Sequence, residues 1–386
     1  MKFTIVLAAV IALVQAAPLI SNGGQAIPGS YIVVLKNGNT PADFQTKFED
    51  IARRQNGRGR KPTISRKFES FPALAVTLND AALKEILASD EVDYVEQDAI
   101  ITLQGTQVNP PSWGLTRVSQ VDRDLTQPYL YNDAAGQGVT AYVIDTGVHI
   151  AHNDFGGRAT WGANFITGSP NTDQNGHGTH VAGTIGGTLH GVAKKVNIVG
   201  VKVLNAQGSG STSGVIAGMD WVATQAVPGK SVVNMSLGGG TSAAINAAAE
   251  RLYAKNIPLI VAAGNSPGVS SCDQSPAGAP NTFTVGSSDS ADRVSSFSSY
   301  GACIEIYGPG TGITSAWIGS NTAVRTISGT SMASPHVAGV AALYLSYLSI
   351  PTAQGLFDQL INTASLNKLT GNLNGAPNRL VFNGAI

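Results

Sequence analysis

The sequence predicts an α/β protein: a three-layer αβα domain on a mostly parallel central sheet, preceded by a small α+β unit. After residue 105, short apolar runs alternate with segments of helical length. These runs are apolar at nearly every position, so their strands must be buried on both faces, as in a parallel sheet covered by helices. Before that point, strand and helix patterns alternate over a shorter stretch, which predicts a separate unit.

The composition bounds the class of protein. Of the 386 residues, 43% are hydrophobic and 12% are charged, which suits one large core and a smaller second one. The net charge is zero, with 11 basic and 11 acidic residues up to position 105 and 13 of each after it. Neither part has the positive excess of a nucleic-acid binder, so no nucleic-acid partner is expected.

The first 16 residues have the pattern of a secretory signal peptide. Lys2 provides the positive start, Phe3 to Val14 the apolar core, and Val14-Gln15-Ala16 the small residues of a cleavage site. The alternative is a membrane anchor, but the run is too short to span a bilayer. We therefore expect cleavage after Ala16 and a product that is secreted, extracellular and without a membrane partner.

Residues 17–105 are expected to form the small α+β unit. The predicted strands are Tyr31–Leu35, Phe71–Leu78, Val92–Val95 and Ile100–Leu103, and the predicted helices are Phe44–Arg54 and Ala81–Ala88. The polar, proline-containing stretch 105–112 is not expected to continue a strand or a helix. It therefore predicts a linker to the larger unit, residues 106–386.

The larger unit alternates strands and helices. The predicted strands are Val139–Ile144, Ile198–Val203, Ser231–Met235, Ile257–Ala262 and Thr282–Gly286, and the predicted helices are His177–Ile185, Thr212–Ala226 and Ala243–Lys255. Sheets of this kind bind ligands beyond the carboxyl ends of their strands. Asp145 directly follows the first strand, while Ser236 and Gly264 follow two others, so these residues are candidates for chemistry.

Ser331 is the candidate nucleophile. It lies among small residues and precedes the apolar run Val337 to Leu345, which has the length and alanine content of a buried helix. Unpaired N–H groups at a helix start point at incoming negative charge and could stabilise an oxyanion. The alternative is that Ser331 only caps the helix.

A serine nucleophile needs a base and an orienting acid. Of six histidines, His336 lies five residues after Ser331 and would point well round the helix, which makes it a poor base. His177 lies between glycines at the start of a helix, and Asp145 offers the acid. The alternative for His177 and His180 is a metal pair, but the glutamate of a zinc-protease motif is missing between them.

The chain order Asp145, His177, Ser331 is the order of the subtilisin triad. From about Trp113 to the C-terminus the chain resembles the subtilases, of the proteinase K-like branch, and the preceding segment resembles their ferredoxin-like I9 inhibitory prosegment. The resemblance implies a monomeric serine endopeptidase that hydrolyses proteins and peptides through an acyl-enzyme, without a catalytic cofactor. It also implies a self-processed zymogen whose prosegment is both intramolecular chaperone and inhibitor.

The resemblance assigns roles to further residues. Asp145 orients His177, His177 is the base, and Asn265 joins the Ser331 N–H in the oxyanion hole. Two glycine-containing segments would flank the substrate and a third would line the first specificity pocket. They are Gly208, Ser209 and Gly210; Ser236, Leu237 and Gly238; and Ala262, Ala263 and Gly264.

Two stabilising features are expected. Cys272 and Cys303 form an even pair in an oxidising compartment, which indicates a disulfide, with two free buried thiols as the alternative. The resemblance also implies a structural calcium ion on the carbonyls of Pro280 and Thr282 and the carboxylate of Glu305. The family has aspartate where this chain has Glu305.

Two other functions can be compared with this one. An esterase of the α/β-hydrolase type carries its triad in the order Ser, acid, His, and only His336 follows Ser331. An inactive, subtilase-like binding protein would be expected to lack a catalytic residue, whereas every catalytic position is filled. The Asn234-Met235-Ser236 glycosylation pattern lies in a predicted core strand, so we expect it to be silent.

Overall fold

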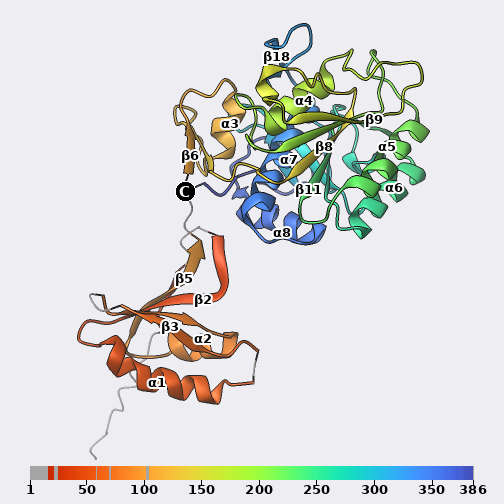
Figure 1. Ribbon diagram of the computed structural model, residues 1–386. Helices are drawn as coiled ribbons and strands as arrows, with labels where there is room; N and C mark the ends of the chain where they lie inside the picture. Colours follow the sequence, from red (N-terminus) through yellow and green to blue (C-terminus); the bar gives the residue numbers. More distant parts are fainter. Residues whose placement is uncertain (1–15, 21–24, 58, 69–70, 101–103, 386) are drawn as a thin grey trace, which may run out of the picture. The chain divides into compact units, whose positions relative to one another are not determined.

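The computed structural model describes residues 16–20, 25–57, 59–68, 71–100 and 104–385 (Figure 1). The chain divides into two compact units, Met1–Thr102 and Leu103–Ala385. Most of the predicted signal peptide lies outside the described residues. Within the described residues, no helix is both long and apolar enough to cross a membrane.

The first unit is a five-stranded sheet with two helices. Its strands are β1 (Leu19–Ile20), β2 (Gln25–Leu35), β3 (Thr63–Lys67), β4 (Ala73–Thr77) and β5 (Val92–Ile100), and its helices are α1 (Pro41–Arg54) and α2 (Asp80–Leu87). The strand order is β1-β5-β2-β4-β3. Phe44 and Phe48 of α1 and Ile86 of α2 share one core with Val33 and Leu74 of the sheet, which confirms a small α+β unit.

Local signals explain where these elements begin. The α1 helix starts before the predicted Phe44 because the Thr40 side chain accepts from the Asp43 amide and Pro41 takes the first helical position. The β3 strand was missed because it is a mostly exposed edge strand with no apolar alternation. A single strand, β5, covers the predicted strand Val92–Val95 and ends at Ile100, the first residue of the predicted strand Ile100–Leu103. Residues 101–103 lie outside the described residues.

The second unit is built on a nine-stranded sheet in the order β19-β20-β16-β15-β13-β11-β8-β10-β9. All neighbours pair in parallel except β19 and β20. The strands are β8 (Thr140–Asp145), β9 (Ala159–Asn164), β10 (Asn197–Lys202), β11 (Ser231–Met235), β13 (Leu259–Ala262), β15 (Phe283–Ser288), β16 (Ile306–Pro309), β19 (Ser365–Leu366) and β20 (Arg379–Leu380). Three short pairs lie outside this sheet: β6 (Gln104–Gln107) with β7 (Tyr129–Asn132), β12 (Gly239–Gly240) with β14 (Gln274–Ser275), and β17 (Ile313–Ala316) with β18 (Val324–Ile327).

Helices cover both faces of this sheet (Figure 1). They are α3 (Trp113–Val118), α4 (His177–Gly186), α5 (Thr212–Gln225), α6 (Ala243–Ala254), α7 (Thr330–Tyr347) and α8 (Ala353–Thr363). Alternate residues of β8 enter two different cores. Val143 packs in the core that includes α4, α7 and α8, whereas Ile144 packs in the core that includes α5 and α6. The predicted αβα layering is therefore confirmed.

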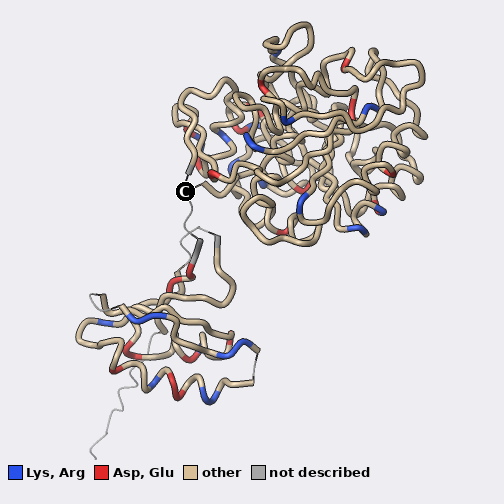
Figure 2. The backbone as a smooth tube through the Cα atoms, in the orientation of Figure 1, with Lys and Arg blue, Asp and Glu red and all other residues tan. Residues whose placement is uncertain are grey.

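The α7 helix is almost entirely buried, from Thr330 to Leu345 with Ser331 half-buried. It contacts β11, β13, β15 and β16 of the sheet. A helix that is apolar all round belongs in the centre of a large core, so the second residue of this helix, Ser331, is held on a rigid element. Basic and acidic residues are sparse along the backbone of the second unit, whereas α1 carries residues of both signs (Figure 2).

The linker prediction is wrong for residues 105–107. Gln104–Gln107 forms β6, which pairs antiparallel with β7. A Cβ atom on Gly105 would lie 2.5 Å from the Tyr131 ring, so a larger residue at this position would require the ring to move. The polar sequence carries no strand signal, and the strand forms because the β7 edge offers backbone hydrogen bonds.

Candidate active site

Asp145 and His177 meet where β8 ends and α4 begins. The Asp145 carboxylate is fully buried, and its two oxygens lie 2.8 and 3.0 Å from His177 Nδ1. The Thr146 amide donates to the same carboxylate at 2.7 Å. With Nδ1–H donating to Asp145, Nε2 of His177 is left to accept a proton.

The pKa of His177 is raised above its ordinary value. Burial alone lowers the pKa, but the attraction and hydrogen bond of Asp145, with a smaller contribution from Asp173, outweigh it. A raised pKa favours the imidazolium form. The pair is therefore suited to taking a proton from a neighbouring hydroxyl group.

Ser331 lies beside the carboxyl end of β11. Its hydroxyl group donates to the Ser236 carbonyl at 3.1 Å, and the Ser236 hydroxyl donates to the Ser331 carbonyl at 2.9 Å. Among the described residues, the Ser331 hydroxyl makes no hydrogen bond to His177. A hydrogen bond from Ser331 to His177 would require the hydroxyl to turn from Ser236; catalytic hydrogen bonds often form only with substrate bound.

Two nitrogen donors, Asn265 Nδ2 and the Ser331 amide, lie near Gly329. Asn265 Oδ1 accepts from the Thr330 amide at 2.8 Å and from the Thr330 hydroxyl at 2.9 Å, which fixes the orientation of the side-chain amide. A Cβ atom built on Gly329 would lie 3.4 Å from Asn265 Nδ2 and 3.6 Å from the Ser331 amide nitrogen. Both nitrogens therefore border one small volume, where they can bind an oxyanion.

A cavity of about 470 Å³ adjoins His177. Its walls include two predicted substrate segments, Gly208–Gly210 and Ser236–Gly238, and its apolar side chains are Leu204, Val215, Leu237 and Ile245. The third predicted segment does not line this cavity. Ala262 and Ala263 are buried, and the Gln274 side chain packs against Gly264.

Comparison with known proteins identifies the family. Residues 136–382 match the model of the subtilase family, and residues 30–104 match that of peptidase inhibitor I9. The chain belongs to the subtilase family. It is a serine endopeptidase that carries an inhibitor prosegment, and hence a protease zymogen.

Similar proteins agree with this assignment. A cuticle-degrading serine protease of Arthrobotrys oligospora is 43% identical over 95% of this chain and 93% of its own length. A subtilisin-like serine protease of Sarocladium strictum is 50% identical over 79% of each chain. The crystal structure of a cold-adapted subtilisin-like serine proteinase is 50% identical with a TM-score of 0.67, covering 70% of this chain and 97% of that one.

Sequence reasoning missed two buried charged residues beside the Asp145–His177 pair. Asp173, four residues before His177, is 4% exposed, and Lys202 in β10 is fully buried. Lys202 Nζ donates to the carbonyls of Thr146 at 2.6 Å and Leu204 at 2.8 Å. Burial lowers the pKa of Lys202, against the attraction of Asp173 and Asp145. In the sequence, Lys202 is a single charged residue in an otherwise apolar strand. Because a buried charge needs polar partners, this position could have indicated a polar cluster.

The other histidines have structural partners. His180 Nε2 lies 3.0 Å from the Ile313 carbonyl and 3.1 Å from that of Arg325, and burial lowers the pKa of His180 to about 3. His336 Nδ1–H donates to the Met332 carbonyl at 2.8 Å, and burial lowers its pKa to about 4. Among the described residues, no three His, Cys, Asp or Glu side chains gather as a metal site.

The glycosylation pattern at Asn234 is buried. Asn234 is 1% exposed, and its amide donates to the Ser236 hydroxyl at 2.9 Å while its carbonyl accepts from Ser334 at 2.7 Å. Attachment of a glycan would break both bonds and open the core. This geometry agrees with the expectation that the pattern is silent.

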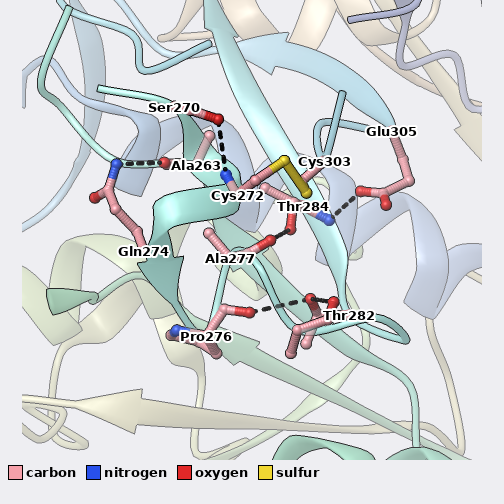
Figure 3. Close-up of a disulfide and its surroundings, with 11 residues drawn as sticks. Ala263, Ser270, Cys272, Gln274, Pro276, Ala277, Thr282, Thr284, Cys303 and Glu305 are labelled. Carbon is pink, nitrogen blue, oxygen red and sulfur yellow. Dashed lines mark hydrogen bonds between the residues drawn. A yellow bond between two sulfur atoms is a disulfide. The ribbon is translucent and has the colours of Figure 1, made fainter. Parts of the chain in front are cut away.

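The predicted disulfide is confirmed. Cys272 and Cys303 are bonded, with their Cα atoms 5.3 Å apart, and no free cysteine is found. The bond joins the short 3-10 helix Ser271–Asp273 to the segment before β16 (Figure 3). It closes a loop across 31 residues, so it limits the freedom of the unfolded chain.

Removing the disulfide should lower thermal stability without changing kcat. A closed loop of this length is worth about 3–4 kcal/mol in the chain-entropy model, or roughly 5–10 °C in Tm. We expect this loss in a Cys272→Ala/Cys303→Ala variant of the enzyme, measured by calorimetry. Mass spectrometry of an unreduced digest provides the control, and two alkylatable thiols in the denatured wild type would contradict the bond.

Proposed function

We propose that this chain encodes a secreted, extracellular endopeptidase with the triad Asp145, His177 and Ser331. The observation that carries the proposal is the pairing of His177 with buried Asp145, together with two N–H donors that face one volume beside Ser331. The signal-peptide pattern at residues 1–16 and the disulfide support secretion.

The residues divide the reaction into two steps. Ser331 Oγ bonds to the substrate carbonyl carbon as His177 Nε2 takes its proton, and Asn265 Nδ2 and the Ser331 N–H stabilise the oxyanion. His177 then gives the proton to the leaving amine, the C–N bond breaks, and an acyl-enzyme remains. Water repeats the sequence and releases Ser331, while Asp145 stabilises the imidazolium in both steps.

Protein and peptide chains are the proposed substrates. The segments Gly208–Gly210 and Ser236–Gly238 border the cavity beside His177, so an extended peptide can pair with their backbones. The apolar side chains of the cavity would receive an apolar substrate side chain. The similar protease of Arthrobotrys oligospora is named cuticle-degrading, which supports a protein substrate here. We propose that the enzyme acts as a monomer.

Labelling with a fluorophosphonate tests this proposal. We expect one covalent label per mature enzyme, on the peptide that contains Ser331, together with loss of casein hydrolysis. Heat-denatured enzyme is the control, because labelling needs the assembled oxyanion hole. A mature enzyme that cleaves casein but carries the label elsewhere would refute the triad.

Asn265→Ala should lower kcat and leave KM nearly unchanged. The Asn265 amide would bind an oxyanion that exists only near the transition state. The expected loss is about 10²–10³-fold, the size found for the corresponding donor in subtilisin. Steady-state kinetics on a chromogenic peptide measures it. Thr330 loses a partner in the same variant, so Tm is measured alongside, and a rise in KM alone would contradict the role.

A structural calcium ion is a further proposal, on the carbonyls of Pro280 and Thr282 and the carboxylate of Glu305. Glu305 accepts from the Thr284 amide at 2.6 Å (Figure 3) and forms no ion pair with a described residue. Burial raises the pKa of Glu305 to about 8. Arg379 attracts Glu305 but forms no ion pair with it, so this buried carboxyl group fits a cation site. A single carboxylate fits only a weak one.

Chelation should reveal this site. We expect EDTA to lower the Tm of the enzyme by a few degrees and millimolar calcium to restore it, because a ligand that binds only the folded state stabilises it. Glu305→Gln should remove the response to both. A wild-type Tm that EDTA leaves unchanged would contradict calcium binding.

A further inference from the structure

Asp173 is a buried carboxylate that accepts five hydrogen bonds. Its Oδ1 accepts from the Thr146 hydroxyl at 2.9 Å and from the amides of Asn175 at 3.0 Å and Gly176 at 2.9 Å. Its Oδ2 accepts from the Thr179 amide at 2.9 Å and the Thr179 hydroxyl at 2.6 Å. It forms no ion pair with a described residue, so these neutral donors stabilise it.

These donors surround the Asp145–His177 pair. Thr146 directly follows Asp145, while Asn175, Gly176 and Thr179 flank His177 on both sides. Asp173 therefore joins the end of β8 to the start of α4, and the two paired residues are the terminal residues of those elements.

Asp173 also serves as the missing cap of α4. The N-cap residue is Gly176, with φ of 102° and no side chain to accept from the first amides. Asp173 takes the Thr179 amide, and the Thr146 hydroxyl takes the Gly178 amide at 2.9 Å. A Cβ atom on Gly178 would clash with the Gly147 carbonyl, so α4 approaches β8 as closely as glycine permits.

We propose that Asp173 is a positioning residue of the triad, which clamps α4 onto β8 and adds negative charge beside the His177 imidazolium. The proposal rests on the proposed function of His177 as the base. A base held by two clamped termini keeps its place when the imidazolium forms, and a misplacement of about 1 Å can cost 10²-fold in rate.

The charged groups around His177 support the proposed electrostatic effect of Asp173 on the imidazolium. Asp145 contacts His177 from β8, Asp173 attracts it from the loop ahead of α4, and both raise the pKa of His177. His180, three residues further along α4, is neutral at pH 7 because burial lowers its pKa to about 3. Lys202 donates to the Thr146 carbonyl and is attracted by both carboxylates. Without Asp173, the imidazolium should be less stable.

Asp173→Asn tests both parts. We expect kcat on a chromogenic tetrapeptide to fall about 10- to 100-fold with KM within twofold. We also expect the acid limb of kcat/KM to move to lower pH. A merely structural role would lower Tm and leave the acid limb in place. The matched control is Asp154→Asn, which alters another buried Asp–His pair, on His190, and should not move the acid limb.

Two further measurements keep the test decisive. The NMR titration of His177 in Ser331→Ala protein, with and without Asp173→Asn, reports the same shift without any activity. A failure of the proposed function is thereby distinguished from a failure of this inference. If Asp173→Asn does not fold, Thr179→Val provides a second test. It deletes one donor to Asp173 together with the acceptor of the His149 amide, and it should lower kcat several-fold. The proposal is overturned if the pKa of His177 is the same in Ser331→Ala protein with and without Asp173→Asn. It is also overturned if Thr179→Val has the kcat of the wild type.

Discussion

Replacing Ser331 by alanine is expected to leave a precursor that keeps its prosegment and has lost about 10⁶-fold in kcat, the size found for the nucleophile of subtilisin. The proposed boundary of the prosegment lies near Gly105–Thr106. If Ser331 makes this cut within its own chain, its hydroxyl group is required for maturation. The precursor should still fold, because Ser331 contributes only a few polar contacts to α7.

The structure adds a condition for this cut. Gly105 and Thr106 lie in β6, paired with Tyr131 and Leu130 of β7. In the proposed mechanism a substrate instead lies along the segments Gly208–Gly210 and Ser236–Gly238, beside His177. Strand β6 must therefore separate from β7 before the bond can be cut. Because β6 has only four residues, the free energy needed to separate it is modest.

Refolding the purified Ser331→Ala precursor alone separates the alternatives. We expect its N-terminus to remain unchanged over hours, whereas the wild type gains a new N-terminus near Thr106. Ser328→Ala, at an exposed serine three residues earlier, is the matched control and should mature normally. A new N-terminus near Thr106 in Ser331→Ala, without added protease, would rule out self-cleavage by Ser331.

Asp145→Asn is expected to lower kcat about 10⁴-fold, the size found when the same change is made in a serine-protease triad. An amide keeps the volume and can still accept from Thr146, but its NH2 group can donate to His177 Nδ1 and so favours the tautomer in which Nε2 carries the proton. It also removes the charge that stabilises the imidazolium. KM should change little, because Asp145 is fully buried and does not touch substrate.

The pH profile of the same variant gives a second readout. In the wild type the pKa of His177 is raised above 6.5, so kcat/KM should fall as the pH drops through a value above 6.5. Asp145→Asn should move this acid limb to lower pH. Asp154→Asn is again the control, and an acid limb that stays in place in Asp145→Asn would contradict the role assigned to Asp145.

The sequence by itself determined the order of the central strands and helices of the second unit. Apolar runs marked β8, β10, β11, β13 and β15, and longer periodic segments marked α4, α5 and α6, mostly to within two residues. These signals are local, because a strand or helix needs only its own pattern of apolar residues. The same patterns placed Asp145 at a strand end and His177 and Ser331 at helix starts, and the even cysteine count indicated the disulfide.

Only the tertiary structure decided which groups meet at the site. The Ser331 hydroxyl bonds to Ser236, 95 residues away, and Asp173 collects donors from β8 and α4. The sequence does not explain why Lys202 stands in an apolar strand, whereas the structure shows two carbonyl groups that accept from it. Strand β6 forms from polar residues because β7 offers it an edge. Such contacts depend on packing to within an ångström between distant segments, which no local pattern of residues records.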